Sequence, residues 1–278
     1  MKMTVEIQGQ RFFVQSEEAV ALSIPLQFNG SQPNHFGTAK AKQEVLRLGG
    51  FVGKTELGGS CNVDVLEFIP HCNGTHTETV SHIVNEDIWI GHAANELACL
   101  AKLVTVPIRD AANCGEAYRP AFEASDQVIT KRDLMIALQR LKDSELGRLD
   151  SKAIIIRTLP NDAEKRQRQY ATGTQPAFLT ADAMQLIDQL GCHHLIVDLP
   201  SVDKMYDDGL LTNHHIFWHV PEGTHSLTGE TRQERTITEM AFIPDDIEDS
   251  VYLLNLQLPC FAGDAAPSRP MIMKLALA

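Results

Sequence analysis

A strand–helix–strand pattern in the second half of the chain limits the possible folds more than any other feature. Residues 153–156 form a short apolar run rich in β-branched side chains, which is typical of a buried strand. Residues 180–191 have helical spacing, with Thr180 as an N-cap and Gly191 as the C-terminal glycine. Residues 194–198 then predict a second buried strand. Because strands joined through a helix run parallel in one sheet, this pattern predicts an α/β fold.

Further elements are predicted on both sides of this unit. A hairpin near the N-terminus turns at Gly9, and a helix begins after Thr130. Residues 27–60 are rich in Gly, Asn and Pro and predict a long ordered loop. Residues 62–70 predict a strand that leads directly into a histidine-rich segment. Tail strands are expected at residues 236–243, 251–258 and 271–277. No linker divides the chain, so we expect one domain over residues 1–278, with a mixed sheet and flanking helices.

Charge and composition exclude several classes of partner. The net charge is -12 and there is no run of Lys or Arg, so we expect no nucleic-acid partner. No apolar run approaches the roughly 18 residues that span a bilayer, and the charged N-terminal residues are unlike a signal peptide. The six cysteines include no CxxC pair, which predicts free thiols in a reducing compartment. We therefore expect a cytoplasmic protein.

The segment from residue 72 to residue 82 is the first candidate for chemistry. In an extended chain Cys72, His76, Glu78 and His82 would share one face, because side chains alternate along a strand. A thiolate, an imidazole and a carboxylate on one face form half of a divalent-metal site. The chain has eleven histidines, however, so this spacing is not specific by itself.

A second candidate group lies about 140 residues further on. His214, His215 and His219 fall within six residues, and Glu239 follows in an apolar run that predicts a strand. A solvent-facing glutamate on an edge strand is the ordinary explanation for Glu239. A buried carboxylate would instead need a partner, and a metal ion is a natural one.

Taken together, these motifs resemble a known family. Residues 72–82 are similar to an HxGTHxDxPxH spacing, and residues 179–203 match a helix-then-strand signature that ends in Asp198-Leu-Pro-Ser-Val-Asp203. With His214 and Glu239 following in order, the chain resembles the cyclase family of metal-dependent hydrolases, which includes bacterial kynurenine formamidases. The resemblance extends from about Ser23 to Pro270.

The resemblance implies a fold and a set of site residues. The fold would be a single α/β domain with a swivelling β/β/α core. His82 matches the catalytic histidine of the family. The implied ligands of one or two divalent ions, zinc first and manganese as the alternative, are Cys72, His76, Glu78, His214 and Glu239. His71 competes with Cys72 for one position, and His215 competes with His214 for another.

The resemblance also implies an activity, although three positions depart from the family pattern. Cys72 replaces a histidine, Glu78 an aspartate and Val80 a proline. The implied reaction is hydrolysis of an amide-type C–N bond in a small carbonyl substrate by metal-activated water, in a homo-oligomer. Cyclisation or dehydration of a polyketide-like compound is an alternative at the same site. A metal-binding protein without catalysis is the alternative from another class.

Overall fold

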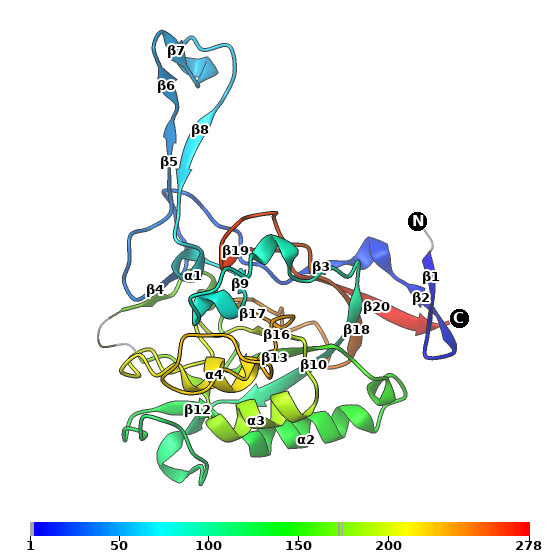
Figure 1. Ribbon diagram of the computed structural model, residues 1–278. Helices are drawn as coiled ribbons and strands as arrows, with labels where there is room; N and C mark the ends of the chain where they lie inside the picture. The colour runs from blue at the N-terminus through cyan, green and yellow to red at the C-terminus, as the bar shows by residue number, and fades with distance from the viewer. Residues whose placement is uncertain (1–2, 172, 174) are drawn as a thin grey trace.

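One large mixed sheet forms the centre of the protein in a computed structural model that describes residues 3–171, 173 and 175–278 (Figure 1). Its strands are β1 (Met3–Ile7), β2 (Gln10–Val14), β3 (Val20–Ala21), β9 (His76–Glu78), β10 (Cys99–Pro107), β13 (Ala153–Leu159), β16 (His194–Val197), β17 (Thr236–Glu239), β18 (Val251–Asn255), β19 (Ala265–Pro267) and β20 (Met271–Leu277). They lie in the order β1-β2-β20-β18-β10-β13-β16-β17-β9-β19, and β3 pairs with β20. The four strands β10, β13, β16 and β17 run parallel, whereas β18 and β9 flank them antiparallel. The predicted α/β fold with a mixed sheet is confirmed.

Helices cover one face of this sheet. They are α2 (Lys131–Lys142), α3 (Ala181–Gln189) and α4 (Thr212–Trp218), and α2 and α3 lie side by side (Figure 1). Both predicted N-caps are confirmed, because the Thr130 side chain accepts a hydrogen bond from Asp133 N and the Thr180 side chain accepts one from Ala183 N. Within the described residues, no helix has both the length and the apolar character needed to cross a bilayer.

Both faces of the central strands are buried. On β13, Ile154 and Ile156 pack into the core beneath the helices, whereas Ile155 packs with Leu22 and Tyr252 on the opposite face. A strand that is covered on both sides needs apolar residues at every position, which explains the unbroken run that predicted it. The parallel β13–α3–β16 unit is therefore present as the sequence predicted.

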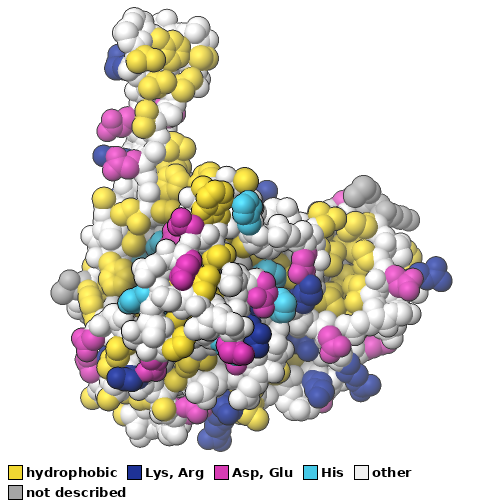
Figure 2. All heavy atoms as spheres, viewed as in Figure 1, with side chains coloured by type: hydrophobic (Ala, Val, Ile, Leu, Met, Phe, Trp, Pro, Cys, Tyr) yellow, Lys and Arg dark blue, Asp and Glu magenta, His cyan; other side chains and the backbone are white. Residues whose placement is uncertain are grey.

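The prediction of a long loop over residues 27–60 is wrong. β4 (Asn34–His35) pairs with β14 (Gln169–Tyr170). β5 (Lys42–Val45) pairs with β8 (Asp64–Glu67), and β6 (Arg47–Leu48) pairs with β7 (Phe51–Val52). Residues 42–67, the arm, project from the body of the protein (Figure 1). Figure 2 shows hydrophobic side chains gathered on the arm, where Leu48, Leu57 and Val65 are exposed.

Close backbone approach requires glycine at two positions of the arm. A Cβ atom on Gly53 would lie 2.4 Å from Val63 O, and one on Gly59 would lie 1.9 Å from Val52 O. Glycine therefore serves here to let two chain segments meet. The same residues, read without their partners, are typical of a loop.

The histidine-rich segment is also not one continuous strand. Pro70 occupies the first turn of a short helix, α1 (Pro70–Asn73), which ends at Gly74. β9 follows with only three residues, and Val80–His82 form a 3-10 turn. The shared face expected for Cys72, His76, Glu78 and His82 therefore does not exist, and tertiary contacts decide which of these side chains meet. The tail strands β17 and β18 end earlier than predicted, whereas β20 has the predicted bounds.

Candidate metal centre

Seven titratable side chains converge where β9, β17 and β19 lie together. This group, the Glu78 cluster, consists of His71, His76, Glu78, His82, His214, Glu239 and Asp264. They come from α1, β9, the turn after it, α4, β17 and the residue before β19. β9 supplies the centre because it pairs with β17 on one side and β19 on the other.

Glu78 is the hub of the cluster and is fully buried. Its Oε1 lies 2.9 Å from His214 Nε2. Its Oε2 lies 2.9 Å from His71 Nδ1, 3.9 Å from His82 Nδ1 and 4.0 Å from His76 Nε2. The two oxygens of one carboxylate therefore face different histidines.

Glu239 closes the cluster from the end of β17. Its Oε2 lies 3.5 Å from His76 Nε2, and its Oε1 lies 3.9 Å from His214 Nε2. The Oε1 atom also accepts a hydrogen bond from Val202 N at 2.7 Å, which fixes the carboxylate against the loop after β16. A glutamate in an otherwise apolar strand thus points into the cluster and not into solvent, since the residue is only 4% exposed.

His214 is held in place by Asp203. The Asp203 Oδ2 atom lies 2.5 Å from His214 Nδ1, and Asp203 Oδ1 accepts hydrogen bonds from Asn213 N and from the Tyr118 hydroxyl. A carboxylate on Nδ1 leaves Nε2 to face Glu78, which is the arrangement found around histidine ligands of metals. Asp203 is the last residue of the Asp198-Leu-Pro-Ser-Val-Asp203 motif, and Asp198 is the first. Asp198 instead binds Lys165 Nζ at 2.7 Å.

Asp264 was not identified from the sequence. Its Oδ2 atom lies 2.8 Å from His71 Nε2 and 3.5 Å from His82 Nδ1. The residue stands directly before β19, whose pairing with β9 brings it to the cluster. Only a prediction of that pairing could have found it, because Gly263-Asp264 otherwise resembles a surface turn.

Neighbouring charges set the protonation of the cluster. Burial alone would raise the pKa of Glu78, but the charges on His82 and His214 and the contacts from His214 and His71 outweigh it and hold that pKa low. Burial likewise disfavours charge on His71, yet Asp264 and Glu78 raise its pKa to about 10. Glu78 and Asp203 raise the pKa of His214 in the same way, against its burial. The carboxylates therefore favour positive charge within the Glu78 cluster.

The residues present fit a divalent cation. Among the described residues, His76 Nε2 and Glu78 Oε2 are buried without a hydrogen-bond partner, since the approach from His71 lacks hydrogen-bond geometry. Three sets of donor atoms lie within 4.8 Å of one another: His71, His76 and Glu78; His71, His82 and Asp264; Glu78, His82 and His214. Imidazole nitrogens with carboxylate oxygens suit zinc, and manganese also accepts such donors.

The structure separates the two pairs of competing ligands. The turn of α1 directs His71 to Glu78, and none of these donor sets among the described residues contains Cys72. Burial raises the pKa of the Cys72 thiol, which lies beside Thr38. On α4, His214 meets Glu78, whereas His215 Nδ1 pairs with Val220 O at 2.9 Å. This placement favours His71 over Cys72, and it favours His214 over His215. The identity of the ligands stays a prediction.

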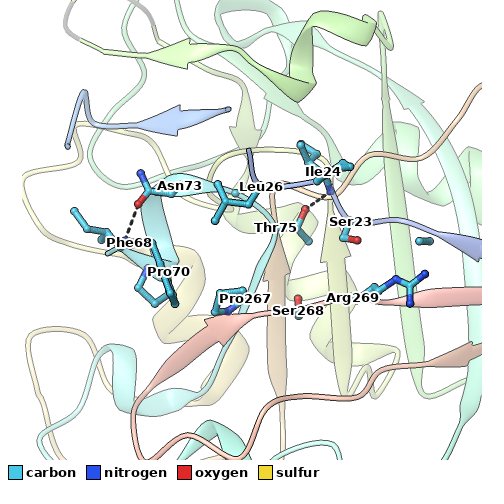
Figure 3. A pocket seen from close by; sticks show the side chains of 14 residues that line it. Ser23, Ile24, Leu26, Phe68, Pro70, Asn73, Thr75, Pro267, Ser268 and Arg269 are labelled. Carbon is cyan, nitrogen blue, oxygen red and sulfur yellow. Dashed lines mark hydrogen bonds between the residues drawn. The ribbon is translucent and has the colours of Figure 1, made fainter. Parts of the chain in front are cut away.

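A separate cavity of about 440 Å³ lies beside the cluster (Figure 3). Its lining comes from residues 21, 23–26, 68–70, 73–75 and 267–269, and it includes no member of the Glu78 cluster. Thr75 ties its wall together, because its hydroxyl donates to Met240 O at 2.5 Å and accepts from Ile24 N at 2.8 Å. These two hydrogen bonds fix Thr75, the residue before His76, and thereby stabilise the position of that histidine.

Comparison with known proteins gives the family. The sequence pattern described as "Putative cyclase" matches residues 20–204, which is more than half of the 278 residues. The chain therefore belongs to the putative cyclase family, as the order of its motifs predicted. No match was found among curated proteins.

Solved structures share the fold at low sequence identity. A protein described as a novel cyclase has a TM-score of 0.61 at 13% identity, covering 94% of this chain and 90% of its own. An isatin hydrolase bound to the product analogue thioisatinate has a TM-score of 0.58 at 13% identity, covering 93% of both chains. A predicted metal-dependent hydrolase from Bacillus stearothermophilus has a TM-score of 0.55 at 14% identity, covering 92% of this chain and 98% of its own. At such identities the likeness establishes the fold alone.

Proposed function

We propose that this protein is a metal-dependent hydrolase that cleaves the amide-type C–N bond of a small carbonyl substrate. N-formylkynurenine-like formamides and cyclic amides such as isatin are the substrate classes to test. The observation that carries the proposal is the Glu78 cluster, in which buried carboxylates and histidines converge while His82 lies at the partly exposed edge. Two solved structures with the same fold, an isatin hydrolase and a protein described as a predicted metal-dependent hydrolase, support the same proposal.

The buried members of the cluster, together with the partly exposed His71, would hold the metal. His71, His76, Glu78, His214 and Glu239 supply the nitrogen and oxygen donors, and zinc is the ion we propose, with manganese as the alternative. When bound, a divalent ion lowers the pKa of a coordinated water to about 7 and polarises the carbonyl of the substrate. Asp203 would hold the proton of His214 on Nδ1, which leaves the lone pair of Nε2 for the ion.

His82 and Asp264 would handle the proton. The His82 side chain is 27% exposed, so a substrate can reach it, and its Nδ1 faces Asp264 Oδ2 at 3.5 Å. A carboxylate on one nitrogen orients the ring and leaves Nε2 for the reacting groups. His82 would then accept a proton from the attacking water and deliver it to the leaving nitrogen. Both tasks need a residue beside the ion that is not one of its ligands.

The proposal is tested by metal content and turnover of the same preparation. Elemental analysis of the purified protein is paired with assays on N-formylkynurenine and isatin, before and after chelation and after adding the metal back. We expect zinc or manganese and a turnover that disappears on chelation and returns on reconstitution. Absence of any metal after reconstitution would overturn the proposal.

The family description favours one other reaction, the cyclisation or dehydration of a polyketide-like compound at the same cluster. Metal binding without amide hydrolysis would direct the search to such substrates. A protein that binds metal without catalysis is distinguished by coordination: its ion would have all four positions filled by side chains, whereas a catalytic ion keeps one open to water.

A further inference from the structure

A second group of metal-binding side chains lies away from the Glu78 cluster. Glu96, Cys99 and His194, the Cys99 cluster, place one carboxylate oxygen, the thiol sulfur and one imidazole nitrogen within 4.8 Å of one another. Cys99 is the first residue of β10 and His194 is the first residue of β16. Glu239 of the other cluster is the last residue of β17, which runs parallel to β16. The two clusters therefore occupy opposite ends of the same set of strands.

The register of the sheet brings these side chains together. Ala153 on β13 pairs with Ala101 on β10 and with His194 on β16, so all three side chains share one face. Cys99 lies two residues before Ala101 and therefore shares that face. β13 stands between the other two strands, but its residue at this level is an alanine. The small side chain leaves room for Cys99 and His194 to meet across it.

His194 is already oriented as a ligand. Its Nδ1 lies 2.9 Å from Thr236 Oγ1, and Thr236 is its partner in the register between β16 and β17. This contact fixes the ring, and no hydrogen bond among the described residues engages Nε2, which is therefore available to an ion. The residue is only 4% exposed, and burial lowers its pKa to about 4, so the ring is neutral at physiological pH.

Glu96 is held by the residue before β13, and the loop that carries it is held by the last residue of β18. Lys152 Nζ, next to the start of β13, binds Glu96 Oε1 at 2.7 Å. Asn255 Nδ2, at the end of β18, donates to Leu97 O at 2.6 Å and fixes the loop. The lysine engages one carboxylate oxygen, which leaves the other for a ligand.

A cavity of about 170 Å³ gives access to this place. Its lining includes Glu96 and His194 and five further polar side chains, which are His92, Asn95, His193, Gln233 and Glu234. Such a volume is several times the roughly 30 Å³ that one water molecule occupies. An ion with a remaining water molecule would therefore fit beside the three donors.

We propose that Glu96, Cys99 and His194 bind a zinc ion, with the fourth position taken by water from the adjoining cavity. A thiolate, an imidazole and a carboxylate form a donor set that favours zinc over magnesium or calcium, which prefer oxygen alone. Binding breaks the S–H bond of Cys99 and forms a Zn–S bond, and the proton passes to solvent. Burial and the charge of Glu96 raise the pKa of the free thiol to about 12, so it is the ion that drives this deprotonation. The ion would join the loop before β10 to two strands of the sheet. The proposal does not depend on the hydrolase proposal.

Cobalt substitution tests this site separately from the Glu78 cluster. The full chain is stripped with a chelator and titrated with Co²⁺, because a cobalt–thiolate bond gives a charge-transfer absorption band that nitrogen and oxygen ligands do not give. We expect the band in the unaltered protein, in Cys72→Ser and in Cys114→Ser, and its loss in Cys99→Ser. Elemental analysis after zinc loading should find one zinc ion fewer per chain in Cys99→Ser. Cys72→Ser is the matched control, since Cys72 is the cysteine beside the Glu78 cluster.

A variant on the partly exposed glutamate covers the case in which Cys99→Ser does not fold. Glu96→Gln keeps the thiol, and we expect it to weaken zinc or cobalt at this site at least about tenfold, the loss that even a second-shell substitution causes. A cobalt–thiolate band that survives Cys99→Ser, or that disappears in Cys72→Ser, would overturn the proposal. An unchanged affinity in Glu96→Gln would also contradict it.

Discussion

His214 on α4 and His194 at the start of β16 are both almost fully buried, yet their pKa values shift in opposite directions. Glu78 and Asp203 raise the pKa of His214 above its ordinary value. Burial lowers that of His194 to about 4, and the charge of Glu96 opposes this only in part. Glu96 is itself paired with Lys152, whereas Glu78 meets only histidines among its ion-pair contacts.

The comparison shows that burial alone does not determine the state of a histidine. Desolvation favours the neutral ring, and direct carboxylate contacts reverse the preference. The three carboxylates of the Glu78 cluster are compensated only by its histidines, so positive charge is needed there, supplied either by protons on the histidines or by a metal. The Cys99 cluster is close to neutral, and its ion would have to displace a proton. Four experiments test this difference between the two clusters.

The largest effect is expected for Glu78→Gln. Removing the central charge should abolish metal binding at the Glu78 cluster and lower kcat/KM at least about 10³-fold, because a bound ion contributes several kcal/mol to transition-state stabilisation. Metal content and amide hydrolysis measure both losses. The cobalt–thiolate band of the Cys99 cluster should persist in this variant, and Glu56→Gln on the arm is the matched control. Loss of the band as well would show that the two ends are not independent.

His82→Ala should lower turnover without removing the metal. A general base contributes about 10²–10⁴-fold, so we expect kcat to fall by at least about 10²-fold while the metal content is unchanged. Steady-state kinetics and elemental analysis of the same sample decide the result. If the metal disappears together with the activity, His82 is a metal ligand and not the general base.

Asp203→Asn should weaken metal binding and leave the fold intact. Loss of the carboxylate that orients His214 should reduce metal affinity about 10–100-fold, the usual cost of a second-shell change. Competition with a chelator measures the affinity, and thermal unfolding of the metal-free protein tests the fold. Asp208→Asn, in the exposed part of the same loop, should bind metal as the unaltered protein does.

The smallest effect concerns His35, whose pKa burial lowers to about 4, with a further contribution from the charge of His76. Neither ring nitrogen has a hydrogen-bond partner among the described residues. Because this pKa lies below the unfolded value of about 6.5, the unfolded state binds more protons at intermediate pH, and stability falls as the pH falls. Lowering the pH from 7 to 5.5 should therefore cost the unaltered protein about 1 kcal/mol more than His35→Gln. Denaturant unfolding at both pH values measures this difference, and equal losses in the two proteins would contradict it.

The family motifs were readable from the sequence because each depends on local order. Thr180, Gly191 and the apolar runs on either side predicted the β13–α3–β16 unit correctly. His76, Glu78, His214 and Glu239 were placed in one site by the order of their motifs, and the structure brings all four together. His82 lies at the edge of the same cluster.

The arm and the helical turn that begins at Pro70 could not be predicted from the sequence. Glycines at Gly53 and Gly59 indicated a loop, whereas the fold uses them where two backbones meet. The assumption of one strand from Cys72 to His82 failed because a helical turn intervenes and directs His71 inward. The register of a segment is set by its partner strands, and a sequence window does not contain those partners.

The sequence by itself therefore determined the fold class, the family and most of the residues that meet at Glu78, because capping, apolar periodicity and motif spacing are local properties. Only the tertiary structure decided between His71 and Cys72 as the side chain that faces Glu78, and only it revealed Asp264 and the Cys99 cluster. The choice of His71 depends on the helical turn of α1, whereas Asp264 and the Cys99 cluster depend on the packing of the strands, which brings residues more than 90 positions apart within a few ångströms. Spacing along the chain carries no record of that distance.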